Sequence, residues 1–482
     1  MSEIKNEMKR GLFWTALDKY SGQIIGIVIS MILARLLTPY DYGVVAAASV
    51  LLGFLSIFSS IGIGPAIIQR KDLSQSDLDN IFTFSILLGI FIGGLSFLSS
   101  WPVADFYGNS LLKPVIQILS LGLFFGTINM VPAALMSKHK RFKEMATRSL
   151  TFQVLFGIIG VISAFWGAGV YALVCPQILA SLCTFLYNNH FYPVRISWRF
   201  SIEPIKRIFA FSLYVFLFEL VNYFSRNLDK IIIGKYISAD ALGYYEKSYR
   251  LMQLPMNNIS AVVYPVLQPI MSQLQDDLHE MSRKFLRIVE IISCLSFPVG
   301  VILYFGAYDI ILLFFGDRWL PSVPVFQILA LSVPLGLLGN PTGAIFMSCN
   351  ASKRMFYTGI ANTLVTITGF IIAAVFWGTV ESIAWAWTIS NSISVMNCYY
   401  QLFVKVMNEC LLPILKTMLL PLFNVAILIP VYYFLLPLQD SWMSIPRLFL
   451  NMAIGGVTIL FFMNKVGVIS FVSLYRKLKH KE

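Results

Sequence analysis

The sequence has 482 residues, of which 57% are hydrophobic and only 12% are charged, and its formal net charge is +12 at pH 7. A water-soluble globular protein carries roughly twice this charged fraction, so a soluble domain is excluded. The mean hydropathy of +0.74 indicates a polytopic membrane protein. Apolar runs of about 20 residues recur along the chain, long enough to cross a bilayer as helices, and the alternation typical of outer-membrane strands is absent.

Taken in chain order, the apolar runs predict an all-α protein of about fourteen transmembrane helices. Helices 1–6 form an N-terminal lobe over residues 1–190, and a basic cytoplasmic linker follows over residues 191–208. Helices 7–12 form a C-terminal lobe over residues 209–404, and helices 13 and 14 with a basic cytoplasmic tail occupy residues 405–482. The expected spans lie near residues 14–36, 43–68, 81–103, 114–136, 147–166, 169–190, 209–236, 243–270, 284–306, 321–347, 356–376, 380–404, 411–436 and 445–466.

The second half of the chain repeats the first. At an offset of about 200 residues Gly243 falls on Gly43 and Ser238 on Thr38. Later matches pair Phe106-Tyr107-Gly108 with Phe314-Phe315-Gly316, and Phe165-Trp166-Gly167 with Phe376-Trp377-Gly378. Because each copy has an even number of spans, both copies enter the membrane in the same orientation, with a pseudo-two-fold axis along the membrane normal. Two such lobes predict a central cavity that holds the substrate.

Basic residues concentrate in alternate connections between the predicted spans. Clusters between Lys138 and Arg148 and between Arg195 and Arg207 fall on one side of the membrane, whereas the opposite connections hold few basic residues. By the positive-inside rule, this asymmetry places both termini in the cytoplasm. It also explains the net positive charge without nucleic-acid binding.

Polar residues follow three of the predicted spans at helical spacing. A charge inside a span costs at least a few kcal/mol unless it faces water or a partner, so these three stripes are the candidate site, and we expect them to line one wet lumen. Their members are Lys19, Gln23 and Ser30, beside Asp18, in the first span, Glu219, Asn222, Arg226 and Asp229 in the seventh, and Glu246, Arg250, Gln253, Asn257, Ser260 and Tyr264 in the eighth.

Simpler interpretations of these charges stay open. Glu246 with Arg250, and Arg226 with Asp229, also fit neutralised pairs that only fix helix ends. Lys235 is interpreted as an anchor near the outer surface. The embedded acids and bases balance in number, so the count does not decide the charge of the cargo.

No sequence feature predicts catalysis or a bound cofactor. The six cysteines contain no CxxC pair and the four histidines have no ligand spacing, so no metal site is expected. Gly-rich phosphate loops and Ser/His/Asp sets are missing, and the outer connections are too brief for a catalytic domain. We expect a protein that is not an enzyme.

Four segments carry a resemblance to a known family. They are ARLLTPYDYGVVA, AIIQRKDLSQSD, DKIIIGKYISADALGYYEKSYRL and FFGDRWLPSVPVFQILAL. In this order, and with this layout of spans, the chain resembles the polysaccharide transporters of the multidrug/oligosaccharidyl-lipid/polysaccharide exporter superfamily over essentially its whole length. It looks most like bacterial O-antigen or colanic-acid-type flippases.

The resemblance implies a flippase that translocates undecaprenyl-diphosphate-linked oligosaccharide repeat units across the bacterial inner membrane by alternating access. It also implies a V-shaped pair of lobes with a cationic lumen, and coupling to a proton or sodium gradient. The expected partners are the lipid-linked substrate, membrane lipids, a polysaccharide polymerase and glycosyltransferases.

The resemblance also assigns roles to the polar stripes. The family's lumenal basic positions carry over to Arg226, Arg250 and Lys19, with the two arginines holding the diphosphate. Asn222, Gln253 and Asn257 are expected to contact the substrate. The charge-tuning or ion-coupling candidates are Asp18, Glu219, Asp229 and Glu246. The alternative is a cation-coupled multidrug or small-solute exporter on the same fold, whose carboxylates would bind the cargo, and a non-transporting scaffold is a more distant third.

Overall fold

The computed structural model describes residues 2–59, 63–70, 72–197, 223–224, 226–439, 444–465 and 467. Within these residues all regular secondary structure is helical and there is no strand, which confirms the predicted all-α class. The helices are α1 (Ser2–Leu36), α2 (Pro39–Ser59), α3 (Ile63–Gln69), α4 (Gln75–Tyr107), α5 (Leu112–Ile128), α6 (Met130–Lys138), α7 (Phe142–Phe165), α8 (Tyr171–Phe191), α11 (Ala239–Ser272), α12 (Leu278–Phe305), α13 (Ala307–Phe315), α14 (Ser322–Ala330), α15 (Val333–Gly339), α16 (Thr342–Ser348), α17 (Ser352–Phe376), α18 (Val380–Tyr400), α19 (Leu412–Gln439) and α20 (Ser444–Lys465), with π-helical segments η1 (Ile233–Ile237) and η3 (Gln401–Val406) and the 3₁₀ turn η2 (Asp317–Trp319).

The described helices make this a multi-pass membrane protein. Nine are long and apolar enough to cross a membrane, and two bent helix pairs raise the number to eleven if each pair is one span. These eleven coincide with eleven of the predicted spans. Helices α11 and α18 also have the predicted positions, but their polar residues keep them out of this apolar set. The seventh predicted span lies mostly outside the described residues, so the count of fourteen stays a prediction.

Two predicted spans are broken. The sequence indicates one continuous helix over residues 114–136 and another over residues 321–347. The structure instead bends α5 against α6 by 41° and α14 against the α15–α16 segment by 42°. Pro132 lies in the first turn of α6 and Pro334 in the first turn of α15. Proline has no N–H to continue a preceding helix but fits a first turn, which explains both breaks.

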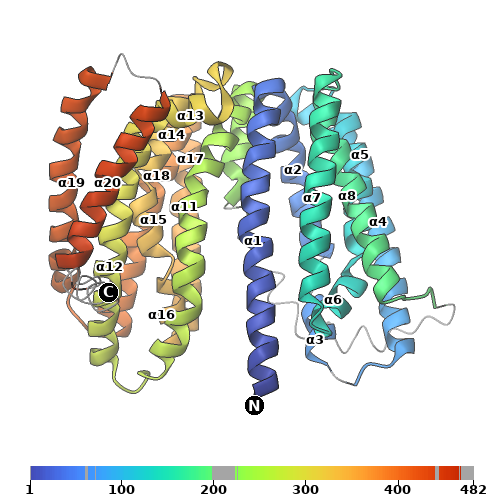
Figure 1. Ribbon diagram of the computed structural model, residues 1–482, viewed down its shortest axis with the longest axis horizontal. Coiled ribbons are helices and arrows are strands. Elements are labelled where there is room, and N and C mark those ends of the chain that lie inside the picture. Colours follow the sequence, from blue (N-terminus) through green and yellow to red (C-terminus); the bar gives the residue numbers. More distant parts are fainter. Residues whose placement is uncertain are drawn as a thin grey trace, which may run out of the picture. The chain divides into compact units, whose positions relative to one another are not determined.

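The chain divides into two compact units, residues 1–243 and 244–482. In unit 1, α4 packs on α5, α5 and α7 pack on α8, and α1 runs beside α7 (Figure 1). The Gln153 side chain of α7 donates to the Gly22 carbonyl of α1 at 2.7 Å, which fixes the axial position of α7 relative to α1. The predicted lobe boundaries at residues 190 and 208 stay a prediction, because residues 198–222 lie outside the described residues.

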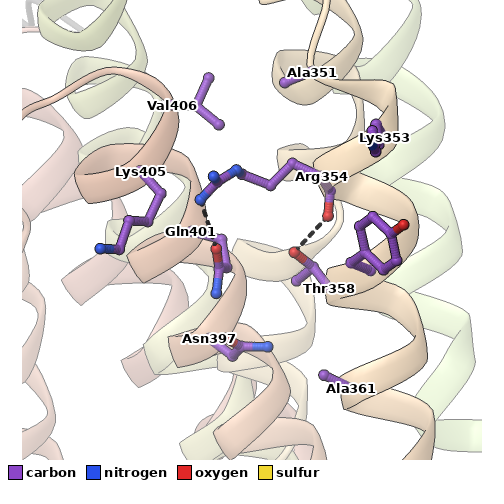
Figure 2. A pocket seen from close by; sticks show the side chains of 10 residues that line it. Ala351, Lys353, Arg354, Thr358, Ala361, Asn397, Gln401, Lys405 and Val406 are labelled. Atoms are coloured by element: carbon purple, nitrogen blue, oxygen red, sulfur yellow. Dashed lines mark hydrogen bonds between the residues drawn. The ribbon is translucent and has the colours of Figure 1, made fainter.

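Unit 2 is built on α12. Helices α15, α19 and α20 pack against α12, and α17 packs against α18. Polar side chains connect this last pair: Asn397 donates to Asn362 at 2.8 Å, and Arg354 donates to Gln401 at 3.2 Å where α18 passes into η3 (Figure 2). Hydrogen bonds between polar side chains of neighbouring membrane helices help to hold such helices together.

The repeat seen in the sequence recurs in the caps of α2 and α11. Before α2, the Thr38 hydroxyl accepts from the Asp41 N–H at 3.3 Å. Before α11, the Ser238 hydroxyl accepts from the Ala241 N–H at 3.0 Å. A hydroxyl at this position satisfies an N–H that the first turn leaves unpaired. The two helices therefore begin with the same capping hydrogen bond at matching positions.

The starts of α2 and α11 also cross at their matching glycines. A Cβ on Gly43 would overlap the carbonyl group of Ala239, and a Cβ on Gly243 would overlap the carbonyl group of Pro39. Only glycine permits this approach of backbone to backbone. The reciprocal contact explains why the glycine is present in both copies.

Candidate functional site

The polar stripe of α11 lies on the side of the helix that is not packed inside unit 2. Arg250 and Asn257 are exposed and Gln253 is half-buried, whereas Leu251 and Met252 on the other side are buried. The Gln253 amide donates to the Tyr249 hydroxyl at 3.1 Å. The structure thus brings three predicted substrate-binding residues onto one face.

Arg250 lies deep along its helix. It comes eleven residues after Ala239, the first residue of α11, which places it about 16 Å along the helix axis. Packing against the rest of unit 2 fixes this region, because the Ser248 hydroxyl donates to the Ser322 carbonyl at 3.1 Å and the Tyr249 ring meets Trp387 edge to face at 5.4 Å. Arg250 therefore projects from a helix that is held on its other side.

Two further predicted cations lie in unit 1. Lys19 on α1 is exposed, while its neighbour Asp18 is half-buried and interacts electrostatically with Arg148 of α7. Arg226 is exposed near the start of the helical residues 226–232. Its place is set by Tyr223, whose hydroxyl donates to the Val50 carbonyl of α2 at 2.6 Å.

The described carboxylate of the seventh span, Asp229, differs from Arg226 in its exposure to solvent. Asp229 is fully buried and accepts a hydrogen bond from the Lys230 N–H at 2.8 Å. Spacing alone placed Asp229 on the face of Arg226, but one is buried and the other is exposed. Glu219 and Asn222 lie outside the described residues.

The embedded acids and bases are equal in number, but they differ in their exposure to solvent. The exposed members are cations: Lys19, Arg226 and Arg250. The described acids Asp18 and Glu246 are half-buried, Asp229 is buried, and Glu290 is half-buried and paired with Arg287 at 2.6 Å. Among the described charges of this set, the accessible ones are therefore positive.

One embedded cation is structural. Lys247 is 2% exposed, and its ammonium lies 5.0 Å from the centre of the Phe315 ring and 5.8 Å from that of Trp319. Cation–π contacts of this kind stabilise a buried ammonium. The segments GYYEKSYRL and FFGDRW, both singled out in the sequence, meet here. Sequence spacing gives no sign of this contact, because the aromatic residues follow much later in the chain.

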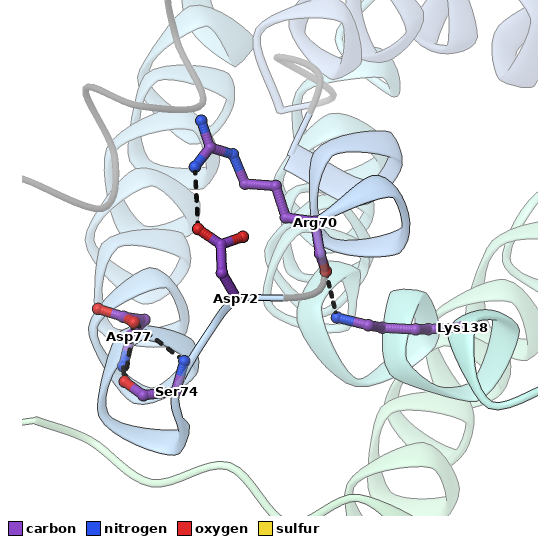
Figure 3. Close-up of polar contacts among 5 residues, drawn as sticks. All are labelled: Arg70, Asp72, Ser74, Asp77 and Lys138. Atoms are coloured by element: carbon purple, nitrogen blue, oxygen red, sulfur yellow. Dashed lines mark hydrogen bonds and ion pairs between the residues drawn. The ribbon is translucent and has the colours of Figure 1, made fainter.

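Another segment of the resemblance forms a turn between α3 and α4 (Figure 3). Ser74 and Asp77 make a capping box at the start of α4. The Lys138 ammonium donates to the Arg70 carbonyl at 2.6 Å, and the Arg70 guanidinium lies 3.6 Å from the Asp72 carboxylate. The segment AIIQRKDLSQSD therefore has a structural role: it ends one helix, starts the next and attaches the turn to α6.

A buried ion pair that the sequence did not predict joins α13 to α20. Arg447 donates through Nε to Asp309 Oδ2 at 2.7 Å and through Nη2 to Oδ1. The Asp309 side chain is 3% exposed. Arg447 lies at the start of the predicted span over residues 445–466, and sequence spacing gives no sign of its partner on α13. Within unit 2, the pair attaches α20 to α13.

Comparison with known proteins identifies the family. The family described as "Polysaccharide biosynthesis protein" matches residues 32–324, which is more than half of the chain. The chain belongs to this family. The family resemblance drawn from the sequence segments is thereby confirmed.

Three relatives of this family member cover most of its length. It is 25% identical to the "Uncharacterized membrane protein in cps region" of Klebsiella pneumoniae, over 85% of this chain and 84% of that protein. It is 26% identical to the teichuronic acid biosynthesis protein TuaB of Bacillus subtilis, over 82% of each chain. It is 24% identical to the lipopolysaccharide biosynthesis protein WzxC of Escherichia coli, over 78% of this chain and 77% of that protein.

Two solved structures share the fold of this polysaccharide biosynthesis protein. The lipid II flippase MurJ in an inward closed conformation superposes with a TM-score of 0.74 at 16% identity, covering 97% of this chain and 99% of that one. An inward-facing multidrug resistance transporter of the MATE family gives a TM-score of 0.61 at 17% identity, covering 78% of this chain and 93% of that one. At these identities the likeness shows the fold alone.

Proposed function

We propose that this protein is a flippase that moves undecaprenyl-diphosphate-linked oligosaccharide repeat units from the cytoplasmic to the periplasmic leaflet of a bacterial inner membrane. Family membership supports a role in polysaccharide biosynthesis, and TuaB and WzxC are both named for the biosynthesis of surface polymers. The fold shared with flippases and exporters supports transport by alternating access without catalysis.

The exposure of Lys19, Arg226 and Arg250 is the observation that carries the proposal. An exposed guanidinium some 16 Å along a helix is costly against lipid and inexpensive in a wet cavity. A diphosphate is a doubly charged group whose oxygens match the planar donor set of arginine. An organic cation would be repelled by the same three side chains.

The proposal gives roles to the charged and amide side chains of the stripes. Arg226 and Arg250 hold the diphosphate, with Lys19 adding positive charge. Gln253 and Asn257, and Asn222 in the seventh span, donate to and accept from sugar hydroxyls. The carboxylates Asp18, Glu219, Asp229 and Glu246 tune this charge or carry a coupling proton or sodium ion.

The orientation of the protein in the membrane, and the side on which each partner enzyme acts, follow from the predicted topology. Both termini lie in the cytoplasm, where glycosyltransferases complete the lipid-linked unit, and a polymerase receives it on the other side. A proton or sodium gradient drives the cycle, so a protonophore or a sodium ionophore that collapses the coupling gradient should stop transport.

Charge reversal at Arg250 tests the function in cells. Arg250→Glu should abolish surface polysaccharide while the protein still reaches the membrane in normal amount. Arg283→Glu makes the same change at an exposed cation of α12 outside the stripes and should leave the polysaccharide intact. Normal polysaccharide in the Arg250→Glu strain would overturn the assignment.

The likeness of fold to a multidrug exporter supports a second candidate, a cation-coupled exporter of drugs or small solutes. In that case Glu219, Asp229 and Glu246 would bind the cargo. Deleting the gene separates the two. Loss of surface polysaccharide supports the flippase, and drug sensitivity with intact polysaccharide supports the exporter.

A further inference from the structure

A pocket of about 640 Å³ opens in unit 2 at the N-terminal end of α17, beside the passage from α18 into η3. Its lining contains the cations Lys353, Arg354 and Lys405 and no acidic residue. Figure 2 shows Arg354 extending across the pocket from α17 toward Gln401, while the ammonium group of Lys405, on η3, points away from the Arg354 guanidinium. A cavity whose lining charges are all positive favours an anion.

Hydrogen bonds between α17 and the segment where α18 passes into η3 fix the separation of the two pocket walls. The Arg354 guanidinium donates to the side-chain amide oxygen of Gln401 at 3.2 Å. Within α17, the Thr358 hydroxyl donates to the Arg354 backbone carbonyl at 2.8 Å. A guanidinium has five N–H donors, so most of those on Arg354 remain for a ligand. The Asn397 amide, also in the lining, is fixed by its hydrogen bond to Asn362. The pocket is thus prearranged.

The start of α17 adds to the positive potential. Its N-cap residue, Ala351, lines the pocket and makes no side-chain hydrogen bond to the first turn. The first N–H groups of a helix carry partial positive charge and are satisfied well by an oxyanion. An anion in this pocket would therefore meet the Arg354 guanidinium and an uncapped end of a 25-residue helix, with Lys353 and Lys405 also in the lining.

The surroundings favour a lipid over a free ion. Helix α17 is one of the nine apolar helices, so a pocket at its end lies where the bilayer meets water. Tyr357, Leu364 and Ile371 recur at a spacing of seven, which places them on one side of α17, and they are 59%, 59% and 50% exposed. Tyr357 is itself part of the lining. An apolar track therefore leads from the pocket along the span.

We propose that this pocket binds the phosphate group of an anionic phospholipid, whose acyl chains lie along the track formed by Tyr357, Leu364 and Ile371. Basic pockets at the ends of membrane helices are suited to such headgroups. The inference is independent of the transported cargo, because none of the three pocket cations belongs to the polar stripes.

Native mass spectrometry of the purified full-length protein tests the inference. Titration with phosphatidylglycerol should show one tightly retained lipid, and phosphatidylcholine, which has no net charge, should bind at least tenfold more weakly. Each cation replaced by glutamine should weaken phosphatidylglycerol binding about fivefold. The combined Lys353→Gln, Arg354→Gln and Lys405→Gln variant should therefore lose the lipid.

Lys416→Gln is the matched control, since Lys416 is an exposed cation on α19 outside the pocket lining; its affinity for phosphatidylglycerol should equal that of the wild type. Equal binding by the triple variant, or equal retention of phosphatidylcholine, would overturn the proposal. Displacement of phosphatidylglycerol by inorganic phosphate would assign the pocket to a free anion instead. The single variants Arg354→Gln and Lys405→Gln give the same test if the triple variant does not fold.

Discussion

Lys247 and Arg250 are cations one turn apart on α11, and their environments are opposite. Lys247 is buried against Phe315 and Trp319, whereas Arg250 is exposed on the polar stripe. Only a cation that reaches water can meet a cargo. This difference divides the embedded charges into a structural group and a group available for transport.

Replacing Lys247 should therefore affect stability. Lys247→Ala removes a desolvated cation–π contact of about 2 kcal/mol and leaves a gap beside two rings. We expect a lower thermal unfolding temperature of the purified protein, while Lys19→Ala, at an exposed site, should leave that temperature unchanged. An unaltered unfolding temperature for Lys247→Ala would contradict the structural role.

The sequence predicts the environment of Arg250 but not that of Lys247. Helical spacing placed Glu246, Arg250, Gln253 and Asn257 on one face, and the continuous helix α11 has this face. The burial of Lys247 could not be predicted in this way, because its aromatic partners come from α13 and the turn after it. Local spacing reports which residues share a face, and it does not report what packs against that face.

At the scale of helices, the crossing of α2 and α11 depends on two glycines. Gly43→Ala and Gly243→Ala each place a methyl group on a backbone carbonyl of the other helix. A backbone clash of this kind cannot be relieved by a side-chain rotation, so we expect little monodisperse protein in fluorescence-detected size-exclusion chromatography.

Gly94→Ala is the control for these glycine variants. It lies within α4, and a Cβ there meets nothing within 4 Å. Its yield should match or exceed that of the wild type, because alanine favours a helix more than glycine does. Wild-type yields of Gly43→Ala and Gly243→Ala would show that the two helix starts do not cross as described.

The ion pair between Asp309 and Arg447 supports a prediction about α13 and α20. Arg447→Ala leaves a buried carboxylate uncompensated, at a cost of about 3–5 kcal/mol. The double variant Asp309→Leu with Arg447→Leu removes both charges and should recover most of the loss in thermal unfolding. If the single and double variants were equally unstable, the loss would come from packing rather than from the unpaired charge.

Helix positions were predicted well, and their interruptions were not. Eleven apolar segments have the expected places, because the length of an apolar run is set by the bilayer itself. The bends at α5–α6 and α14–α15 were missed, since hydropathy does not distinguish a proline that starts a new helix from one inside a continuous helix. The Asp309–Arg447 pair was missed because its partners are distant in the sequence.

For the whole molecule, the fold and the family follow from features spread along the chain: the order of spans, the repeated helix starts and a family match over residues 32–324. The charge of the cargo depends instead on a few side chains. Counting acids and bases left it open, and the exposure of Lys19, Arg226 and Arg250 favours an anionic cargo. The proposed flippase function therefore requires that these cations act on a lipid-linked diphosphate.

The most direct measurement is flipping by the purified protein in vesicles. The wild type should move an undecaprenyl-diphosphate-linked oligosaccharide to the opposite leaflet when an ion gradient is imposed. Arg283→Glu should do so at the same rate, and Arg250→Glu should reduce the rate at least tenfold. Movement of the lipid-linked oligosaccharide by Arg250→Glu at the wild-type rate, or no movement by the wild type, would contradict the account.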